Sequence, residues 1–269
     1  EPHFTMSRRR QLVSLAAWAS LSLLAAAGAH AQSPGWSKIR VGVEGAYPPF
    51  SEVGTDGKLK GFDIDIANAL CAHLKAECVL VPQEWDGMIP ALQARKFDAI
   101  VASMAITEER KKAVNFTDKY YNTPAWLVGK VGTPPDQSAA AWKGKRIGVQ
   151  RTTTHDRYVT QYFKGSEIVR YAKQDEVFLD LAAGRIDTML CDSIAADQGI
   201  IKKPMGKGFA PIGPAIDDPA IFGTGSGIAV RKADTDLQKK LNEAIAGIRA
   251  NGAYKKINDK YFDFDVYGK

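Results

Sequence analysis

The chain has 269 residues, 45% of them hydrophobic, and its 36 basic and 30 acidic side chains give a net charge of +6. This size suits one large domain or two small ones. Outside residues 1–31 the charge excess falls to four, and no run of Lys and Arg interleaved with aromatic residues occurs there. The composition therefore argues against nucleic acid as a partner.

Residues 1–31 have the pattern of an export signal. We interpret residues 1–5 as a cloning remnant ahead of a start at Met6, after which come three arginines, an apolar stretch and a small-x-small triplet that ends at Ala31. The alternative is a membrane anchor, but the apolar stretch is short for a membrane span. We expect cleavage near Ala31 and a soluble, exported protein.

Hydrophobic periodicity predicts strands and helices in alternation. In the first half the predicted order is strand 40–44, helix 62–74, strand 78–81, helix 87–95, strand 97–101 and helix 108–113. The second half repeats the order as strand 146–150, helix 154–163, strand 168–171, helix 175–183, strand 187–191 and helix 194–202. This alternation indicates two α/β units built on parallel sheets. A strand at 225–230, a helix at 234–249 and an aromatic tail at 261–267 are expected to return to the first unit.

Three cysteines lie outside the export signal. Cys71 and Cys78 flank the junction between a predicted helix end and a predicted strand. An exported protein can keep a disulfide, so we expect these two residues to be bridged, with two buried free thiols as the alternative. Cys191 is interpreted as a small buried strand residue, and a reactive thiol beside Asp192 is its alternative.

Two opposite charges follow strands in the two predicted units. Arg110 comes after the strand at 97–101, and Asp192 ends the strand at 187–191. A free amino acid carries a carboxylate and an ammonium on one carbon, so a cleft that holds it needs a fixed cation facing a fixed anion. We hypothesise that this pair grips a small zwitterion. The alternatives are a surface Arg on a polar helix and an Asp that caps the helix from Ser193.

Seven strings carry a resemblance to a known family. They are EGAYPPF (44–50), GFDID (61–65), WDGMIPAL (85–92), KFDAI (96–100), ITEER (106–110), AGRID (183–187) and KYFDFDVYG (260–268). In this order and spacing they resemble the family-3 periplasmic solute-binding proteins, in particular the lysine/arginine/ornithine- and histidine-binding members. The resemblance covers the chain from about Lys38 to Gly268.

The resemblance implies the α/β fold of the type II periplasmic binding proteins. In this fold two lobes, each a parallel-type sheet flanked by helices, are joined by two crossing strands, and the cleft between them closes on a ligand like a Venus flytrap. The expected bounds are 33–121 and 223–269 for lobe 1, 124–220 for lobe 2, and 121–123 and 217–225 for the hinges.

The resemblance also implies how the ligand backbone is held. Arg110 would take the α-carboxylate through its paired donors, because a guanidinium matches a carboxylate bidentately. The helix that opens at Thr107 would add backbone N–H donors, and Ser103 would add a hydroxyl. Asp192 would accept the α-ammonium.

For the ligand side chain, the resemblance implies an aromatic sandwich with a distal anion. Tyr47 and Trp85 would enclose the side chain, with a contribution of about 0.5–2 kcal/mol for each cation–π contact. A hydrophobic staple ahead of a helix is the alternative for Trp85. Glu44 would meet the distal cation, at a position where the family often has Asp.

The chain departs from the usual pattern of the basic-amino-acid binders at several positions. The substituted or variable positions are Ala102, Ala105, Trp85, Gln150, Thr153 and His155. The two alanines remove hydroxyls, although Ala102 can still offer backbone groups and Thr153 keeps a hydroxyl. His155 is expected either at the ligand side chain or on a helix surface. Alanines combined with Trp also resemble the opine-binding relatives.

We therefore expect the binding component of an ABC amino-acid importer rather than an enzyme. Its ligand would be arginine, ornithine or lysine, with histidine as a further option, and its partner an inner-membrane permease. The resemblance implies a periplasmic monomer without a cofactor. We expect no metal site, because the histidines are few and scattered. The alternatives are an opine-binding protein, a cyclohexadienyl-dehydratase-like enzyme that uses Glu44 or His155, and a sensory or adhesive module.

Overall fold

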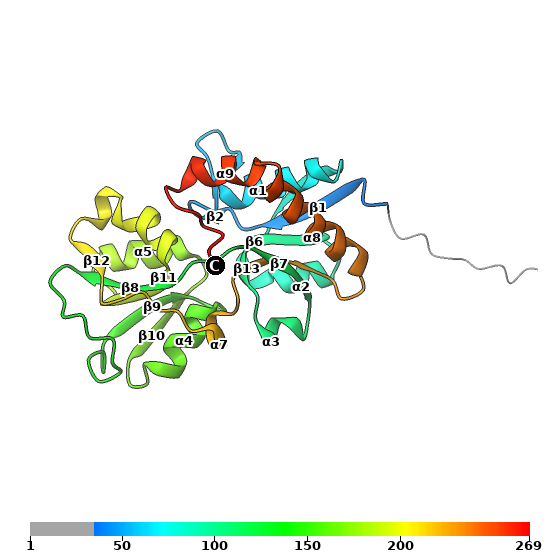
Figure 1. Ribbon diagram of the computed structural model, residues 1–269. Coiled ribbons are helices and arrows are strands. Elements are labelled where there is room, and N and C mark those ends of the chain that lie inside the picture. Colours follow the sequence, from blue (N-terminus) through cyan, green and yellow to red (C-terminus); the bar gives the residue numbers. More distant parts are fainter. Residues whose placement is uncertain (1–34) are drawn as a thin grey trace, which may run out of the picture. The chain divides into compact units, whose positions relative to one another are not determined.

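The computed structural model describes residues 35–269, so the predicted export signal lies outside the described residues. Residues Trp36–Lys269 form one compact unit that contains two five-stranded sheets and their helices (Figure 1). Within this part of the chain, no helix has the length and apolar character needed to cross a membrane.

The first sheet combines strands from both ends of the described chain. Its strands, in spatial order, are β5 (Glu77–Pro82), β1 (Lys38–Val43), β6 (Ala99–Ala105), β13 (Ser226–Val230) and β7 (Asn115–Tyr121). β1 runs parallel to β5 and β6, whereas β13 is antiparallel to β6 and β7. The sheet is therefore mixed, and the return of the chain to the first unit at β13 is confirmed.

The second sheet has the same mixed character. Its spatial order is β10 (Glu167–Tyr171), β9 (Arg146–Gln150), β11 (Thr188–Asp192), β8 (Ala125–Lys130) and β12 (Phe209–Pro211). β9 is parallel to β10 and β11, and β8 is antiparallel to β11 and β12. The expectation of parallel-type sheets is thus right for the three strands predicted in each unit. It is incomplete because β7, β8 and β12 were not predicted and β13 enters the first sheet in the opposite direction.

Helices cover both faces of each sheet. On the first sheet, α1 (Phe62–His73), α8 (Thr235–Ala250) and α9 (Ala253–Tyr261) pack together on one face, and α2 (Met88–Gln93) covers the other. β6 serves both cores because its side chains alternate: Ala99 and Val101 face α1, while Ile100 and Ala102 face α2. The aromatic tail packs on the first lobe as expected, with the rings of Phe62 and Phe262 5.2 Å apart.

The remaining elements are short or belong to the second sheet. They are α3 (Glu108–Lys111), α4 (Thr154–Tyr162), α5 (Gln174–Ala182), α6 (Ser193–Ala196) and α7 (Pro219–Phe222), together with a small sheet of β2 (Ala46–Tyr47), β3 (Ser51–Val53) and β4 (Leu59–Lys60). Three further helical segments are not α-helical: η1 (Trp85–Gly87), η2 (Asp197–Ile201) and η3 (Pro204–Gly206). The chain passes from the first sheet to the second between Tyr121 and Ala125. The assignment of hinges there and near 217–225 stays a prediction.

The expected disulfide is not confirmed. Cys71, Cys78 and Cys191 are free thiols in the structure, and this agrees with the alternative given for the first pair except that Cys78 is only half-buried. The Cys78 thiol donates instead to the carbonyl oxygen of Ala67 on α1, at 3.6 Å. Cys191 is completely buried, and this burial raises the pKa of its thiol well above the ordinary value. The structure therefore favours a core residue over a reactive thiol at Cys191.

One buried guanidinium joins β13 to the loop before β6. Arg231 is 8% exposed and donates to the carbonyl oxygens of Leu92 and Phe97, at 3.0 and 2.6 Å, and to the carboxylate of Asp98 at 2.9 Å. Asp98 also accepts from Arg40. Burial alone would raise the pKa of Asp98, but hydrogen bonds from Arg40 and Arg231 hold it below its ordinary value.

Replacing Arg231 by Met should lower the free energy of unfolding by about 3–5 kcal/mol, because one partner of a buried ion pair is removed. Lys38→Met is the matched control: its ion pair with Glu77 is exposed, so the change should stay within about 1 kcal/mol. Urea denaturation of both variants measures the difference. Equal midpoints for the two variants would contradict this account of Arg231.

Candidate functional site

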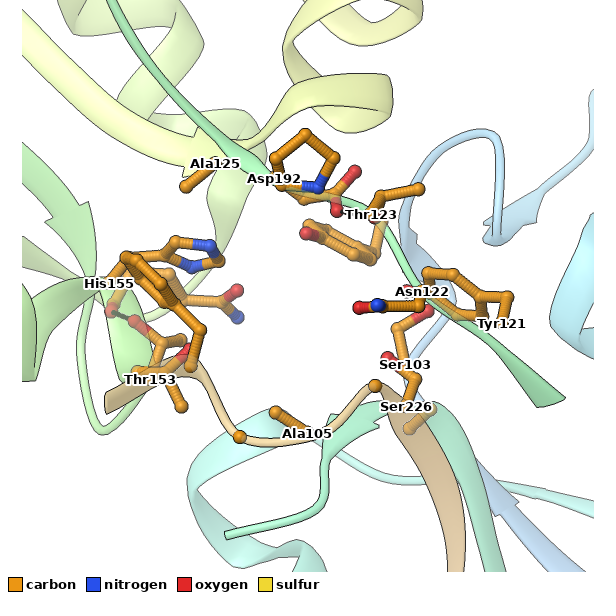
Figure 2. A pocket seen from close by; sticks show the side chains of 18 of the residues that line it. Ser103, Ala105, Tyr121, Asn122, Thr123, Ala125, Thr153, His155, Asp192 and Ser226 are labelled. Atoms are coloured by element: carbon orange, nitrogen blue, oxygen red, sulfur yellow. Dashed lines mark hydrogen bonds between the residues drawn. The ribbon is translucent and has the colours of Figure 1, made fainter. Parts of the chain in front are cut away.

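A narrow cleft, partly open to solvent, lies between strands of the two sheets. All the candidate site residues line it: Glu44, Tyr47, Trp85, Ala102, Ser103, Ala105, Arg110, Gln150, Thr153, His155 and Asp192. Figure 2 shows labelled side chains from both sheets around an open centre, with Thr153 and His155 across from Ser103 and Asn122. The structure therefore brings together every residue that the sequence suggested for the site.

Strand ends explain why these residues meet. Glu44 follows the last residue of β1, Ala105 ends β6, Gln150 ends β9 and Asp192 ends β11. The carboxyl ends of parallel strands share one edge of a sheet, and ligands of open α/β sheets bind outside that edge. Because both sheets direct this edge toward the same cleft, the polar side chains at the strand ends gather there.

Arg110 is a half-buried cation that faces the cleft. Its backbone N–H donates to Thr107 Oγ1 at 3.2 Å, and this N-cap fixes the start of α3. Its guanidinium donates to the carbonyl oxygen of Ala105 at 2.9 Å and lies 5.3 Å from the Trp85 ring centroid. Burial lowers the pKa of Arg110 to about 10, so the side chain is still charged at neutral pH. The alternative of a surface arginine does not describe this residue.

Asp192 has two roles, one of which is the alternative given for it. Oδ1 accepts from the N–H groups of Ile194 and Ala195, at 2.8 and 3.1 Å, and so caps α6. Oδ2 accepts from the hydroxyl of Thr123. Burial raises the pKa of Asp192 to about 6, although these hydrogen bonds act in the opposite direction. The carboxylate thus caps a helix and also lines the cleft.

Glu44 and Gln150 connect the two sheets across the cleft. Gln150 Nε2 donates to Glu44 Oε1 at 2.8 Å and to the carbonyl oxygen of Ala172 at 3.1 Å. Burial raises the pKa of Glu44 to about 7, more than the hydrogen bond from Gln150 lowers it. A carboxyl group whose pKa is raised toward neutrality therefore occupies one end of the cleft.

The two aromatic candidates are buried to the same degree. Tyr47 and Trp85 are each 9% exposed and line the cleft. Tyr47 stacks on Phe50 with ring centroids 5.5 Å apart. Trp85 packs with the hydrophobic cluster around α2, and the guanidinium of Arg110 lies over its ring. The residue therefore packs ahead of the helix, as the alternative expected, and also lines the cleft.

The hydroxyl of Ser103 is committed to the protein. Ser103 has a positive φ of 54°, and its Oγ donates to Asp63 Oδ2 at 2.8 Å. Its N–H donates to the hydroxyl of Tyr120 at 3.0 Å, and that hydroxyl donates to Asp63 Oδ1 at 2.7 Å. Burial raises the pKa of Asp63 to about 7. Ser103 therefore offers the cleft only the lone pairs of its oxygen.

Thr153 and His155 lie at the start of α4. Thr153 Oγ1 caps the helix by accepting from Asp156 N at 3.1 Å and donates to the carbonyl oxygen of Gln150 at 2.7 Å. His155 lines the cleft with its ring 5.6 Å from that of Phe222. Burial, followed by the nearby charge of Arg110, lowers the pKa of His155 to about 4. The histidine is thus neutral and faces the cleft rather than a helix surface.

Further lining residues were not among the candidates. They are Tyr121, Asn122, Thr123, Pro124, Ala125, Thr154, Gln174, Asp217, Phe222, Gly223, Gly225 and Ser226. Most belong to the two segments in which hinges were predicted. Because a hinge segment borders the cleft, that prediction could have identified these residues as lining residues. Within residues 35–269, no group of three or more His, Cys, Asp or Glu side chains is placed to hold a metal.

Comparison with known proteins identifies the class. Residues 39–264 match the family of bacterial extracellular solute-binding proteins, family 3, and the chain belongs to this family. This result confirms the resemblance found in the sequence.

The similar members of this family are amino-acid-binding proteins. The chain is 53% identical over 232 residues to the L-arginine-binding protein of Pseudomonas aeruginosa, covering 86% of this chain and 90% of the relative. It is 43% identical over 250 residues to the histidine-binding periplasmic protein of Salmonella typhimurium, covering 92% and 95%. An ancestral arginine-binding protein bound to arginine has a TM-score of 0.77 at 36% identity, covering 84% of this chain and 98% of that one. These relatives are similar to the chain over nearly all of their own length.

The raised pKa of Glu44 predicts how stability depends on pH. The carboxyl group titrates near 4.5 when unperturbed and near 7 in the folded protein, so the unfolded chain ionises first as the pH rises. The free energy of unfolding of the ligand-free protein should therefore fall between about pH 4.5 and 7, with up to about 3 kcal/mol from Glu44. Glu44→Gln should flatten this fall in urea titrations at pH 5 and 8. The exposed change Glu77→Gln is the control, and an unaltered slope in Glu44→Gln would refute the assignment.

Proposed function

We propose that the protein is the periplasmic binding component of an ABC importer for a cationic L-amino acid, with arginine as the first candidate. One observation carries this proposal: the cleft holds one cation, Arg110, and two acidic groups that are at least half-buried, Asp192 and Glu44, while its third acidic residue, Asp217, is exposed. Arginine has the complementary set of one carboxylate and two cations. The 53% identity to an L-arginine-binding protein supports the same ligand class.

Each charge has a proposed role. Arg110 binds the α-carboxylate, because its guanidinium is charged, half-buried and directed into the cleft. Asp192 accepts the α-ammonium through Oδ2, whose present protein donor is the hydroxyl of Thr123. Glu44 meets the distal cation, and a bound cation favours the carboxylate form over the protonated form. Tyr47 and Trp85 enclose the aliphatic stem.

Closure of the two lobes is part of the proposal, with hinges at 121–123 and 217–225. Contacts that join the two sheets across the cleft support it. Beside the bond between Glu44 and Gln150, Asp86 accepts from the Arg151 guanidinium and from Thr152 Oγ1, the latter at 3.0 Å. In the proposed importer, this closed form is what an inner-membrane permease recognises. We propose a monomer that binds its ligand without turnover.

Arg110→Met should weaken binding of arginine, lysine, ornithine and histidine alike by about 10- to 100-fold, because all of them share the α-carboxylate. Isothermal titration of refolded protein measures this, since refolding removes retained ligand. The control is Arg185→Met, an exposed arginine that pairs with Asp180 away from the cleft. Full affinity in Arg110→Met would refute the carboxylate role, and a wild-type protein that binds only octopine or nopaline would indicate an opine receptor.

Binding of arginine should release protons below about pH 7. In the free protein the pKa of Glu44 is about 7 and that of Asp192 about 6, and a bound cation stabilises both carboxylates. Affinity should therefore rise from pH 5.5 to 8. Titration calorimetry in two buffers with different ionisation enthalpies counts the released protons. Glu44→Gln should reduce the count, and an unchanged count would show that Glu44 does not face the ligand cation.

A further inference from the structure

Residues 262–269, here called the C-terminal tail, contain most of a sequence motif that the proposed binding site does not use. The motif KYFDFDVYG spans residues 260–268, and none of its residues lines the cleft. The tail follows α9 and ends beside the passage of the chain between the two sheets (Figure 1). A segment at this position can act on the cleft without touching a ligand.

A buried amide clamps the tail onto α9. Asn258 is 5% exposed, and its Nδ2 donates to the carbonyl oxygen of Phe264 at 2.8 Å. Its Oδ1 accepts from the N–H of Val266 at 2.9 Å, and Val266 is itself completely buried in the core of the first lobe. One side chain thus satisfies two backbone groups of the tail, which fixes the path of the tail.

The clamped tail in turn holds the first residue after β7. Asn122 donates its backbone N–H to the carbonyl oxygen of Val266 at 2.9 Å. The next tail residue, Tyr267, reinforces this contact, because the charged groups of Arg249 and Lys119 lie 3.4 and 4.6 Å from its ring centroid. The tail therefore connects α8, α9 and β7 of the first lobe to Asn122.

The bonding partners of the chain change from the first lobe to the second directly after Asn122. The hydroxyl of Thr123 donates to Asp192, and the carbonyl oxygen of Pro124 accepts from the N–H of Ser193 at 2.9 Å. Asn122 is therefore anchored on the first lobe and also lines the cleft. In the proposed closure, the rotation in this segment begins after Asn122.

We propose that Asn258 is a positioning residue, which acts through the tail to hold Asn122 on the first lobe and so restricts the hinge. Ordering a backbone residue costs conformational entropy, and a hinge residue that is already fixed loses no such freedom when the cleft closes. Releasing the tail frees Asn122 in the open form, so closure becomes less favourable and the ligand leaves faster. The inference rests on the proposed function, because it requires that ligand binding closes the cleft.

Asn258→Leu tests the inference at similar side-chain size. It leaves two backbone groups of the tail without a protein partner, so these groups turn to water and the tail detaches. Titration calorimetry of refolded protein should show affinities for arginine and lysine that fall by the same factor, about fivefold or more, because the tail contacts no ligand. Stopped-flow measurements should show release faster by a similar factor. Lys256→Met, an exposed change on the same helix, should bind as the wild type does.

Small-angle X-ray scattering reports the hinge directly. The ligand-free Asn258→Leu protein should have a larger radius of gyration than the ligand-free wild type, because its open form is less restricted. The two proteins should agree when saturated with arginine. A loss of stability alone would not produce this difference.

Two further variants separate positioning from stability. Val266→Ala removes buried side-chain atoms but keeps the backbone bonds to Asn122 and Asn258, so it should lower the melting temperature and leave the affinity within about twofold. Asn258→Asp keeps an acceptor for the N–H of Val266, so its affinity should lie between those of the wild type and Asn258→Leu. If Asn258→Leu does not fold, Asn258→Asp carries the test. Folded Asn258 variants with wild-type affinity, or an equal loss of affinity in Val266→Ala, would overturn the inference.

The two proposals fail in distinguishable ways. A wild-type protein that binds no cationic amino acid would refute the proposed function, and scattering of the ligand-free proteins would still test the tail. An unchanged radius of gyration in Asn258→Leu would overturn the inference and leave the proposed function intact.

Discussion

Burial of acidic groups without a contacting cation is the constraint on which the cleft depends. Glu44, Asp63 and Asp192 are held by hydrogen bonds from uncharged groups, and burial raises the pKa of each. Asp98 is the contrast, because two arginines contact it and its pKa is lowered. Arginine side chains thus neutralise the carboxylate of Asp98 within the fold, whereas no arginine or lysine among the described residues contacts those three acids.

Much of this arrangement could be predicted because it follows from strand ends. The strand predicted at 146–150 is β9, and Glu44, Gln150 and Asp192 all lie at or just after the ends of predicted strands. Residues at these positions converge whenever parallel strands share a sheet. Arg110 looks like a surface residue by its charged neighbours, and only its position in the family motif ITEER (106–110) placed it in the cleft.

What could not be predicted depends on pairing between distant segments. β7 contains Asp118 and Lys119 in its middle, and α9 is rich in charged residues, so their own patterns are weak. Their structure comes from packing against β13 and α1. The bond from Ser103 to Asp63 and the two bonds of Asn258 to the tail are likewise matters of atomic position. A sequence identifies the residue type but not which of its atoms is already occupied.

The contacts of Asp86 with Arg151 and Thr152 join the two sheets through side chains that are partly exposed to solvent. Asp86 and Arg151 do not line the cleft, so this contact cannot discriminate between one ligand side chain and another. In the proposed hinge motion, opening the cleft would break this contact. The contact would then contribute to how long any ligand stays bound, and because exposed ion pairs are screened by salt, that contribution would weaken as ionic strength rises.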